Sequence, residues 1–296
     1  MPPKNECVKL SCVIPSVDRQ KLLLNLLINL EYQTFQDYEI IVVEQSRILA
    51  EEIIDYIDKS KGKVRLIRSQ IRSLPNARNI GIQNAKSDII LFIDDDIQPD
   101  KNLFYKHYTA YSDSNISAVG GRITGGYDRG NSFNKIGELR NWDAKVIRNF
   151  HRNIKCDVKH LPGGNMSFRK IVFDKIGGFD LLFGGSSVGE ETDLCLRAYG
   201  NGFKLIFLPD ASLVHFHVKK GGVHNINFKE WLYWHAHNLI LFSLRHIPLH
   251  FLVPITLLRI VRFFMFAFEY ADISLVPIGL KGVLGGISSY LKSKQE

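Results

Sequence analysis

The first 124 residues alternate between short apolar runs and segments whose apolar residues recur at helical spacing, and this alternation constrains the fold more than any other feature. The apolar runs are Leu10–Pro15, Tyr38–Val43, Lys63–Arg68, Ile89–Ile93 and Ala118–Thr124. The segments with helical spacing are Arg19–Leu30, Ala50–Asp58, Pro75–Ala85 and Pro99–Asp113. Such alternation predicts a mainly parallel sheet with helices on both faces. The side chains that carry chemistry are then expected at the carboxyl ends of the strands.

Three consecutive carboxylates, Asp94, Asp95 and Asp96, follow the apolar run Ile89–Ile93. No neighbouring residue in the sequence neutralises them, and adjacent like charges at the end of a buried strand are costly unless a cation or solvent compensates them. A divalent cation that holds a phosphorylated ligand would explain the arrangement. A solvated acidic loop is the alternative.

Composition indicates an ordinary globular chain with a basic excess. Its 296 residues are 45% apolar and 23% charged, with a net charge of +8. The excess suits nucleotide phosphates or anionic lipid, and because no nucleic-acid-binding motif is visible, nucleic acid is not an expected partner. The four cysteines lack metal-ligand spacing and the N-terminus lacks the apolar core of a signal peptide, so the body of the protein is expected on the cytoplasmic side.

The alternation stops between residues 125 and 159, where we expect mixed helix and loop. Order returns with a helix over Glu190–Tyr199 and a strand over Lys204–Leu208 that ends at Pro209. A helix is expected over Phe228–Leu244, and the stretch from residue 279 to 291 is apolar and glycine-rich with no clear period.

The segment Ile247–Phe268 is strongly apolar but is interrupted by Arg259 and Arg262. Its longest charge-free stretch, Ile247–Leu258, is short of the about 20 residues that span a bilayer. Thr256 and the two arginines recur every three residues and fall on one side of a helix. We expect this helix to lie in a membrane interface with its arginines toward the headgroups. A helix that packs against the protein core is the alternative.

Six short motifs occur in a particular order. They are Val13-Ile14-Pro15, Ile41-Val42-Val43-Glu44, Asn76-Ala77-Arg78-Asn79-Ile80-Gly81, Phe92-Ile93-Asp94-Asp95-Asp96, Gly177-Gly178-Phe179-Asp180, and Gly189-Glu190-Glu191-Thr192-Asp193-Leu194 with Arg197. This order, over residues 9–218, resembles family 2 glycosyltransferases. The resemblance implies the GT-A fold, a Rossmann-like, mainly parallel sheet flanked by helices, here with an apolar amphipathic C-terminal helical extension. We expect a catalytic domain at 1–227, with a nucleotide-sugar half at 1–124 and an acceptor half at 125–227, and a membrane-associating extension at 228–296.

The resemblance places a metal site on the carboxylate triplet. The family's aspartate–any–aspartate motif falls on Asp94 and Asp96; in relatives the last acid binds Mn2+ or Mg2+ and the first contacts the ribose side of the nucleotide. A hard cation with oxygen ligands offsets the charge that builds up on a departing diphosphate. Asp95 points away or gives a second contact. In some relatives a histidine at the place of His215 completes the cation shell, so the resemblance implies His215 as a third ligand. A structural histidine is the alternative.

Three further residues are implied at the nucleotide. Pro15 marks where the backbone approaches the base, and Glu44 stands where the family usually has an aspartate that reads the base or ribose. Arg78 faces the base or the diphosphate, whose oxygens suit a guanidinium. The alternatives are a strand-end surface acid for Glu44 and a structural ion pair for Arg78.

The pair Glu190–Glu191 matches the family's Glu-Asp pair, whose aspartate is the catalytic base. Glu191 holds that position, and Glu190 is the fallback. Asp193 and Arg197 are four residues apart, so they can pair on a helix in a structural role. The segment 163–165, Gly-Gly-Asn, resembles the family's acceptor-side loop.

The resemblance thus implies an inverting, metal-dependent glycosyltransferase. It would move a sugar from a nucleotide-diphosphate sugar, a UDP-sugar foremost, to a hydroxyl of a glycan or lipid-linked acceptor in polysaccharide biosynthesis. The apolar C-terminus adds an expected peripheral location on the cytoplasmic face of the inner membrane. A transferase that loads a polyprenyl phosphate, and a catalytically degenerate sugar-binding or scaffold protein, remain alternatives.

Overall fold

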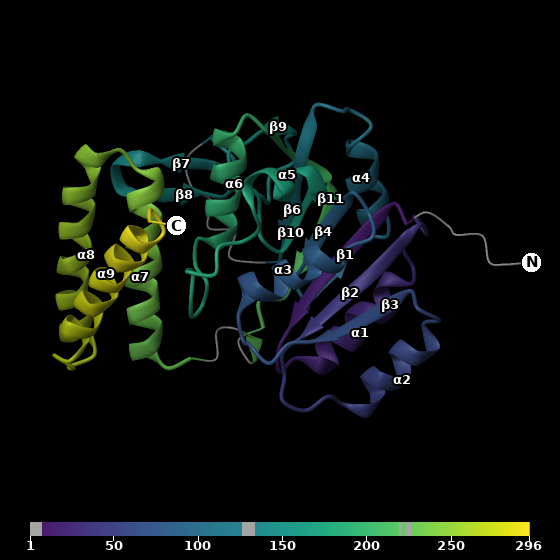
Figure 1. The fold of residues 1–296 in the computed structure, drawn as a ribbon, viewed down its shortest axis with the longest axis horizontal. Helices are drawn as coiled ribbons and strands as arrows, with labels where there is room; N and C mark the ends of the chain where they lie inside the picture. Colours follow the sequence, from purple (N-terminus) through teal and green to yellow (C-terminus); the bar gives the residue numbers. More distant parts are fainter. Residues whose placement is uncertain (1–7, 126–133, 219–220, 223–225, 296) are drawn as a thin grey trace, which may run out of the picture.

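The computed structural model describes residues 8–125, 134–218, 221–222 and 226–295. In this part of the chain, four parallel strands form one side of the main sheet (Figure 1): β1 (Leu10–Ser16), β2 (Tyr38–Glu44), β3 (Val64–Arg68) and β4 (Ile89–Ile93). The sheet runs in the order β3-β2-β1-β4, followed by β10 (Asn165–Arg169), β6 (Ile116–Thr124), β11 (Lys204–His215) and β5 (Ile97–Pro99). The predicted, mainly parallel sheet is therefore confirmed, and its order reverses beside β1, where parallel sheets place their ligand sites.

The strands beyond β4 mix directions. They are β5 (Ile97–Pro99), β6 (Ile116–Thr124), β10 (Asn165–Arg169) and β11 (Lys204–His215). β10 is antiparallel to both β4 and β6, whereas β11 is parallel to β6 and antiparallel to β5. The last pairing matters for function because its register sets His215 opposite Ile97, directly after the carboxylate triplet.

Helices cover both faces of the sheet, as the alternation predicts. α1 (Gln20–Leu30), α2 (Glu51–Lys59) and α4 (Leu103–Ala110) share one apolar core with the strands, and α3 (Leu74–Asn84), α5 (Lys170–Ile176) and α6 (Glu190–Gly200) share the other. Along β4, Leu91 and Ile93 belong to the first core, while Ile90 and Phe92 belong to the second. Because successive side chains of a strand point to opposite faces, a strand covered on both sides is apolar throughout.

Two expectations about the middle of the chain are wrong. In the described part of 125–159, β7 (Glu138–Arg140) and β8 (Lys145–Ile147) form an antiparallel hairpin around the 3-10 turn Asn141–Asp143, and β9 (Cys156–Asp157) pairs with β11. In addition, β11 does not end at Leu208. It continues past Pro209 through a register shift between Leu208 and Ser212, because a bulge removes the need for the proline to donate a hydrogen bond.

Three helices follow: α7 (Phe228–His246), α8 (Leu249–Glu269) and α9 (Leu275–Lys292). They lie side by side at one end of the molecule and share their own apolar core (Figure 1). α9 covers the glycine-rich stretch that has no clear period, and its glycines let it approach α7: a Cβ at Gly282 would lie 2.4 Å from the carbonyl oxygen of Tyr233. The domain boundary at residue 227 stays a prediction.

α8 is continuous over 21 residues despite its two arginines, so the charge-free stretch underestimates its length. Among the described helices, it alone is long and apolar enough to cross a membrane, judged by length and composition. The expectation that both arginines face outward is wrong. Arg262 is exposed, whereas Arg259 is half-buried and its Nε is shielded from solvent. Positions 259 and 263 share a face of the helix, and Phe263 is in the core between the helices.

Candidate active site

The carboxylate triplet lies at the carboxyl end of β4, and the pairing of β5 with β11 brings His215 to it. The Nε2 atom of His215 is 3.2 Å from Asp94 Oδ2 and 3.4 Å from Asp96 Oδ1. One ligand atom from each of the three residues lies within 4.8 Å of the other two. The structure therefore brings together the three residues that the sequence analysis named as metal ligands, although Asp94 and Asp96 lie between β4 and β5 and His215, at the end of β11, follows Asp94 by 121 residues.

The two carboxylate oxygens of Asp96 have different surroundings. Oδ2 accepts a hydrogen bond of 2.9 Å from the backbone N–H of Val218 and lies 3.3 Å from the guanidinium of Arg19. Oδ1 is buried and has no hydrogen-bond donor within the described residues. A buried carboxylate oxygen left without a partner is costly. Because this oxygen faces Asp94 and His215, two oxygens and one imidazole nitrogen form a donor set that fits a divalent cation such as Mn2+.

The protonation of Asp94 and His215 is coupled. Burial raises the pKa of Asp94, but the hydrogen bond from His215 and the charges of Arg78 and Arg19 outweigh burial and lower the pKa below its ordinary value. Burial lowers the pKa of His215, but the hydrogen bond to Asp94 and the charges of both aspartates outweigh it and raise the pKa. The two aspartates therefore favour the charged form of the imidazole, and the imidazole favours the charged form of Asp94.

Asp95 points away from this cluster, which is one of the two orientations left open by the sequence. Its carboxylate accepts hydrogen bonds from Ser16 Oγ at 2.8 Å and from Arg19 at 3.2 Å. Burial raises the pKa of Asp95 to about 7, although these two contacts act in the opposite direction. Asp95 thus ties the triplet to the end of β1, and Arg19, which no motif indicated, bridges Asp95 and Asp96.

Arg78 extends from α3 to the centre of the site and makes an ion pair with Glu190 at the start of α6. It also donates to the carbonyl oxygen of Gly163 at 2.8 Å and lies 3.7 Å from Asp94 Oδ1. Burial raises the pKa of Glu190, and the charge of Arg78 opposes that effect only in part. The ion pair that the sequence left as the alternative for Arg78 is therefore present. The guanidinium of Arg78 lies between Asp94 and the acidic pair of α6.

Glu191 is the more accessible member of the acidic pair. Its side chain is 17% exposed and lies 3.7 Å from Arg148, whereas the side chain of Glu190 is 2% exposed. The backbone of Gly163 and Gly164 runs between Glu191 and the cluster. A Cβ at Gly163 would lie 3.3 Å from Glu191 Cγ, and one at Gly164 would lie 2.4 Å from Asp94 Oδ2. The glycines thus allow the two groups of carboxylates to approach one backbone segment from opposite sides.

Pro15 and Glu44 lie at the ends of β1 and β2, where Pro15 pairs in register with Val43 and Ser16 with Glu44. Glu44 is not a surface acid, because its side chain is fully buried. One carboxylate oxygen accepts hydrogen bonds from Ser46, and Oε2 is buried with no donor among the described residues. The contact of Pro15 and Glu44 with a nucleotide stays a prediction.

A mainly parallel sheet with helices on both faces, and acidic residues at the carboxyl end of β4, are the features of a domain of the GT-A fold. The family described as glycosyl transferase family 2 matches residues 11–177, more than half of the chain. The chain therefore belongs to glycosyltransferase family 2. Its structure gives the physical reason for the motif order, because the motifs from β1, β2, α3, β4 and α6 meet at one edge of the sheet.

Known proteins agree with this assignment. A curated relative, described as probable glycosyltransferase YdaM of Bacillus subtilis (strain 168), is 24% identical over 217 residues, which are 70% of this chain and 50% of the relative. The chain thus spans about half the length of that protein. The structure of GalNAc-T7 with UDP, GalNAc and Mn2+ superposes with a TM-score of 0.60 and 19% identity, covering 80% of this chain and 51% of the other.

Two other solved structures share the fold. S. aureus TarS (residues 1–349) in complex with UDP gives a TM-score of 0.55 at 15% identity, over 81% of this chain and 67% of that one. The mannosyltransferase PcManGT from Pyrobaculum calidifontis, in complex with GDP-Man and Mn2+, also gives 0.55, at 13% identity, over 95% of this chain and 75% of the other. At these identities the likeness shows the GT-A fold.

Proposed function

We propose that this protein is a metal-dependent, inverting glycosyltransferase that moves a sugar from a nucleotide-diphosphate sugar to an acceptor hydroxyl. The observation that carries the proposal is the cluster of Asp94, Asp96 and His215, in which a buried carboxylate oxygen accepts no hydrogen bond from any residue that the structure describes. Relatives of the same fold support it, since two of them hold a nucleotide or nucleotide-sugar together with Mn2+.

The three residues of the cluster would hold the cation, which when bound offsets negative charge on a departing diphosphate. Glu191 would accept the proton of the acceptor hydroxyl as the acceptor oxygen attacks the anomeric carbon on the face opposite the diphosphate. Glu191 is better placed for this role than Glu190, which is held by Arg78. Arg78 would hold the buried Glu190 through their ion pair, and it adds positive charge beside Asp94, where the donor diphosphate is expected.

A screen for nucleotide release tests the proposal. The protein would be supplied with Mn2+ and a panel of UDP- and GDP-sugars with and without glycan acceptors. We expect release with at least one donor, its loss in Asp96→Asn, and no loss in Asp210→Asn, which changes a 60% exposed aspartate of β11. Release that survives Asp96→Asn would contradict the metal assignment. Transfer that survives Glu191→Gln would favour a phosphate acceptor, such as a polyprenyl phosphate, over a hydroxyl.

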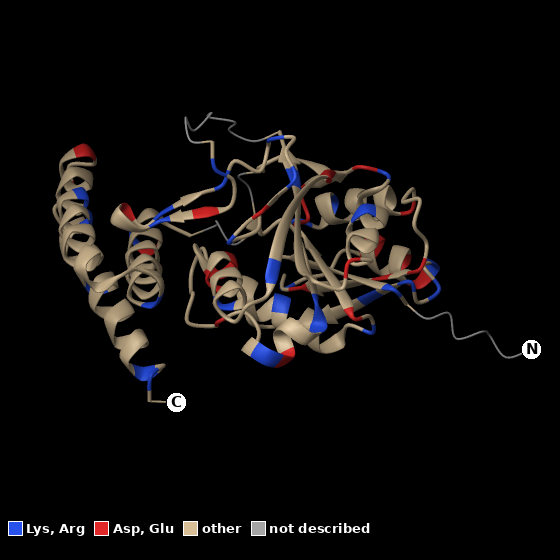
Figure 2. Ribbon diagram, turned by 90° about the horizontal axis from the view of Figure 1, so that it is seen from above, with Lys and Arg blue, Asp and Glu red and all other residues tan. Residues whose placement is uncertain are grey.

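The acceptor proposal is a lipid-linked glycan, reached from the cytoplasmic face of a membrane. α8 exposes a continuous row of apolar side chains, which are Leu249, Val253, Leu257, Leu258, Val261, Phe264, Met265 and Phe268, with Leu249 82% and Phe268 91% exposed. Charged residues are sparse along the C-terminal helices (Figure 2). An exposed apolar face of this extent is typical of a surface that meets a membrane or a partner, and the exposed Arg262 suits anionic headgroups.

Cosedimentation with vesicles containing anionic lipid tests this part separately. We expect the chain to bind such vesicles and the double variant Val253→Asp, Val261→Asp to stay in solution. The matched control is Ile48→Asp, which adds a charge at an 81% exposed apolar residue between β2 and α2, outside the C-terminal helices. Equal binding by all three proteins, or no binding by the unaltered chain, would refute the membrane proposal and leave the catalytic proposal untouched.

A further inference from the structure

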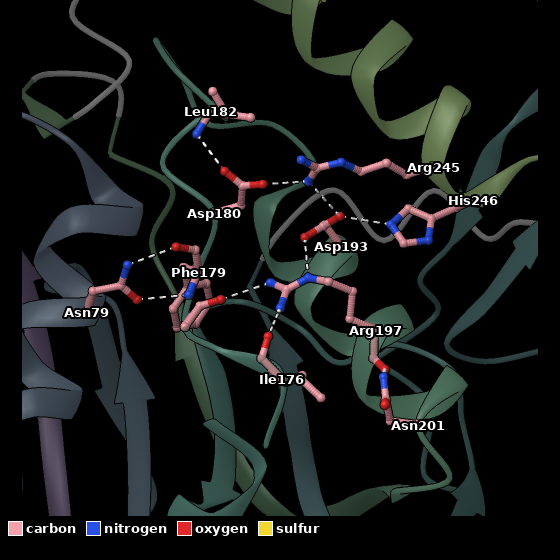
Figure 3. A network of polar contacts seen from close by, with 11 residues as sticks. Asn79, Ile176, Phe179, Asp180, Leu182, Asp193, Arg197, Asn201, Arg245 and His246 are labelled. Atoms are coloured by element: carbon pink, nitrogen blue, oxygen red, sulfur yellow. Dashed lines mark hydrogen bonds and ion pairs between the residues drawn. The ribbon is translucent and has the colours of Figure 1, made fainter. Parts of the chain in front are cut away.

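A buried carboxylate joins the first turn of α6 to the end of α7 (Figure 3). Asp193 accepts hydrogen bonds from His246 Nε2 at 2.8 Å and from Arg197 Nε at 2.8 Å, and Arg245 lies 3.3 Å from it. Arg245 also pairs with Asp180 at 2.6 Å. Arg197 belongs to α6 itself, but Arg245 and His246 are the last basic residues of α7 and follow Asp193 by more than 50 residues.

The same helix holds the segment that leads into α6. Gly184 and Gly185 lie against the ring of Trp234, since a Cβ at either glycine would approach a ring atom to 2.4 Å. Asn238 donates a hydrogen bond of 2.9 Å to the carbonyl oxygen of Gly184. Phe183, just before these glycines, is buried in a small core with two α7 residues, Leu241 and Phe242. α7 therefore contacts both the entry to α6 and its first turn.

The first turn of α6 needs such external support. Its N-cap is Gly189 in a left-handed conformation with φ of 93°, and no side chain caps the helix. Three carboxylates, Glu190, Glu191 and Asp193, are crowded into this turn. The amino end of the helix favours negative charge, but a turn without a side-chain cap gives little intrinsic stability. The position of Glu191 thus depends on what holds its neighbours.

We propose that Arg245 and His246 of α7 are positioning residues for the transfer reaction, because they fix the first turn of α6 and thereby aim Glu191 at the acceptor oxygen. This inference rests on the proposed role of Glu191 as the base. It gives the C-terminal helices a function besides membrane attachment, since α7 completes the acceptor side of the active site. The donor side, formed by β4 and β11, has no contact with Arg245 or His246 among those described above.

The test compares His246→Ala and Arg245→Ala with a matched control, Lys229→Ala. Lys229 lies at the opposite end of α7 and pairs with Asp272 at 2.9 Å and with Ser274 at 2.8 Å, and both residues belong to the connection between α8 and α9. Each protein would be assayed with the donor identified by nucleotide release and a soluble acceptor. Binding of UDP with Mn2+ would be measured by calorimetry. Hydrogen exchange of the segment 181–194 would be followed by mass spectrometry.

We expect both α7 variants to lower kcat by about 10- to 100-fold while the KM for the donor changes less than about twofold, since misplacing a catalytic group by about 1 Å has this effect on rate. UDP binding should be unchanged and exchange in 181–194 faster. Lys229→Ala should alter none of these values. His246→Gln keeps an N–H donor that can reach Asp193, so this variant should recover most of the lost kcat. If His246 only stabilised the fold, recovery of kcat would not be expected to follow the donor.

A kcat equal to that of the unaltered protein in both folded α7 variants would overturn the inference, and so would unchanged hydrogen exchange in 181–194. If Lys229→Ala lowers kcat by the same factor, the effect is one of general stability, and the inference is overturned as well. The failure of the proposed function is distinguishable, because the unaltered protein would then transfer no sugar from any donor. In that case the positioning role of Arg245 and His246 would also be refuted, whatever the hydrogen-exchange rates show.

Discussion

Replacing Asp193 by asparagine removes the buried charge at which α6 and α7 meet. Burial would raise the pKa of this carboxyl, but the contacts with His246 and Arg197 outweigh burial and lower it from 3.8 to about 2. At about 1.4 kcal/mol for each tenfold change in proton affinity, this preference for the ionised form contributes about 2 kcal/mol to folding near neutral pH. Because the folded-state pKa lies below the unfolded value, the contribution is present above about pH 4 and is lost as the pH falls toward about 2.

The melting temperature of the intact chain measures this effect. At about 2–4 °C for each kcal/mol, we expect Asp193→Asn to melt about 4–8 °C lower near neutral pH, with the difference narrowing below about pH 4. Asp272→Asn is the control: the pKa of its carboxyl is also lowered to about 2, but the side chain is partly exposed, so solvent screens its charge and the loss should be much smaller. Equal losses in both variants, or a loss in Asp193→Asn that does not depend on pH, would refute this reasoning.

Three further variants test the packing. Gly164→Ala places a carbon 2.4 Å from Asp94 Oδ2, so we expect Mn2+ affinity to fall about 10-fold or more by calorimetry. Phe92→Ala empties the centre of the aromatic cluster on the α3 side of the sheet, and denaturant unfolding should show a loss of about 3–5 kcal/mol. Gly282→Ala forces α9 away from α7 at a cost of about 1–3 kcal/mol, so proteolysis of the C-terminal helices should accelerate while UDP binding is unchanged. An unchanged Mn2+ affinity, free energy of unfolding or proteolysis rate would contradict the explanation given for the corresponding variant.

The strands that the sequence predicts best are those buried on both faces. β1, β2 and β4, which are buried throughout, appear within about one residue of their expected bounds, because a covered parallel strand is a continuous apolar run bounded by polar residues. The hairpin of β7 and β8 was not predicted. Its strands have three residues each, too few to show a period, and they form only because the chain pairs with itself across the turn.

Some residues of the candidate site can likewise be predicted from the sequence, and others cannot. Asp94, Asp96 and His215 could be named from motifs, because each follows or ends an apolar strand at a characteristic place. Arg245 and His246 could not, because they lie in an apolar helix with no motif and gain a role only when α7 packs beside α6. The direction of a side chain is likewise decided by tertiary contacts.

Arg78 illustrates this last point. The sequence favoured a contact with the base or the diphosphate and left an ion pair as the alternative, and the structure gives the ion pair with Glu190. Glu190 could be paired in this way only because α3 and α6 face each other across the sheet edge, and a local pattern does not contain that information.

Anomalous diffraction from a crystal of the protein soaked with Mn2+ and UDP tests the central claim most directly. The account predicts one strong manganese peak bounded by Asp94, Asp96 and His215, with Asp96 Oδ1, which has no hydrogen-bond donor among the described residues, as a ligand. A manganese peak elsewhere, or none at this cluster while UDP is bound, would contradict it.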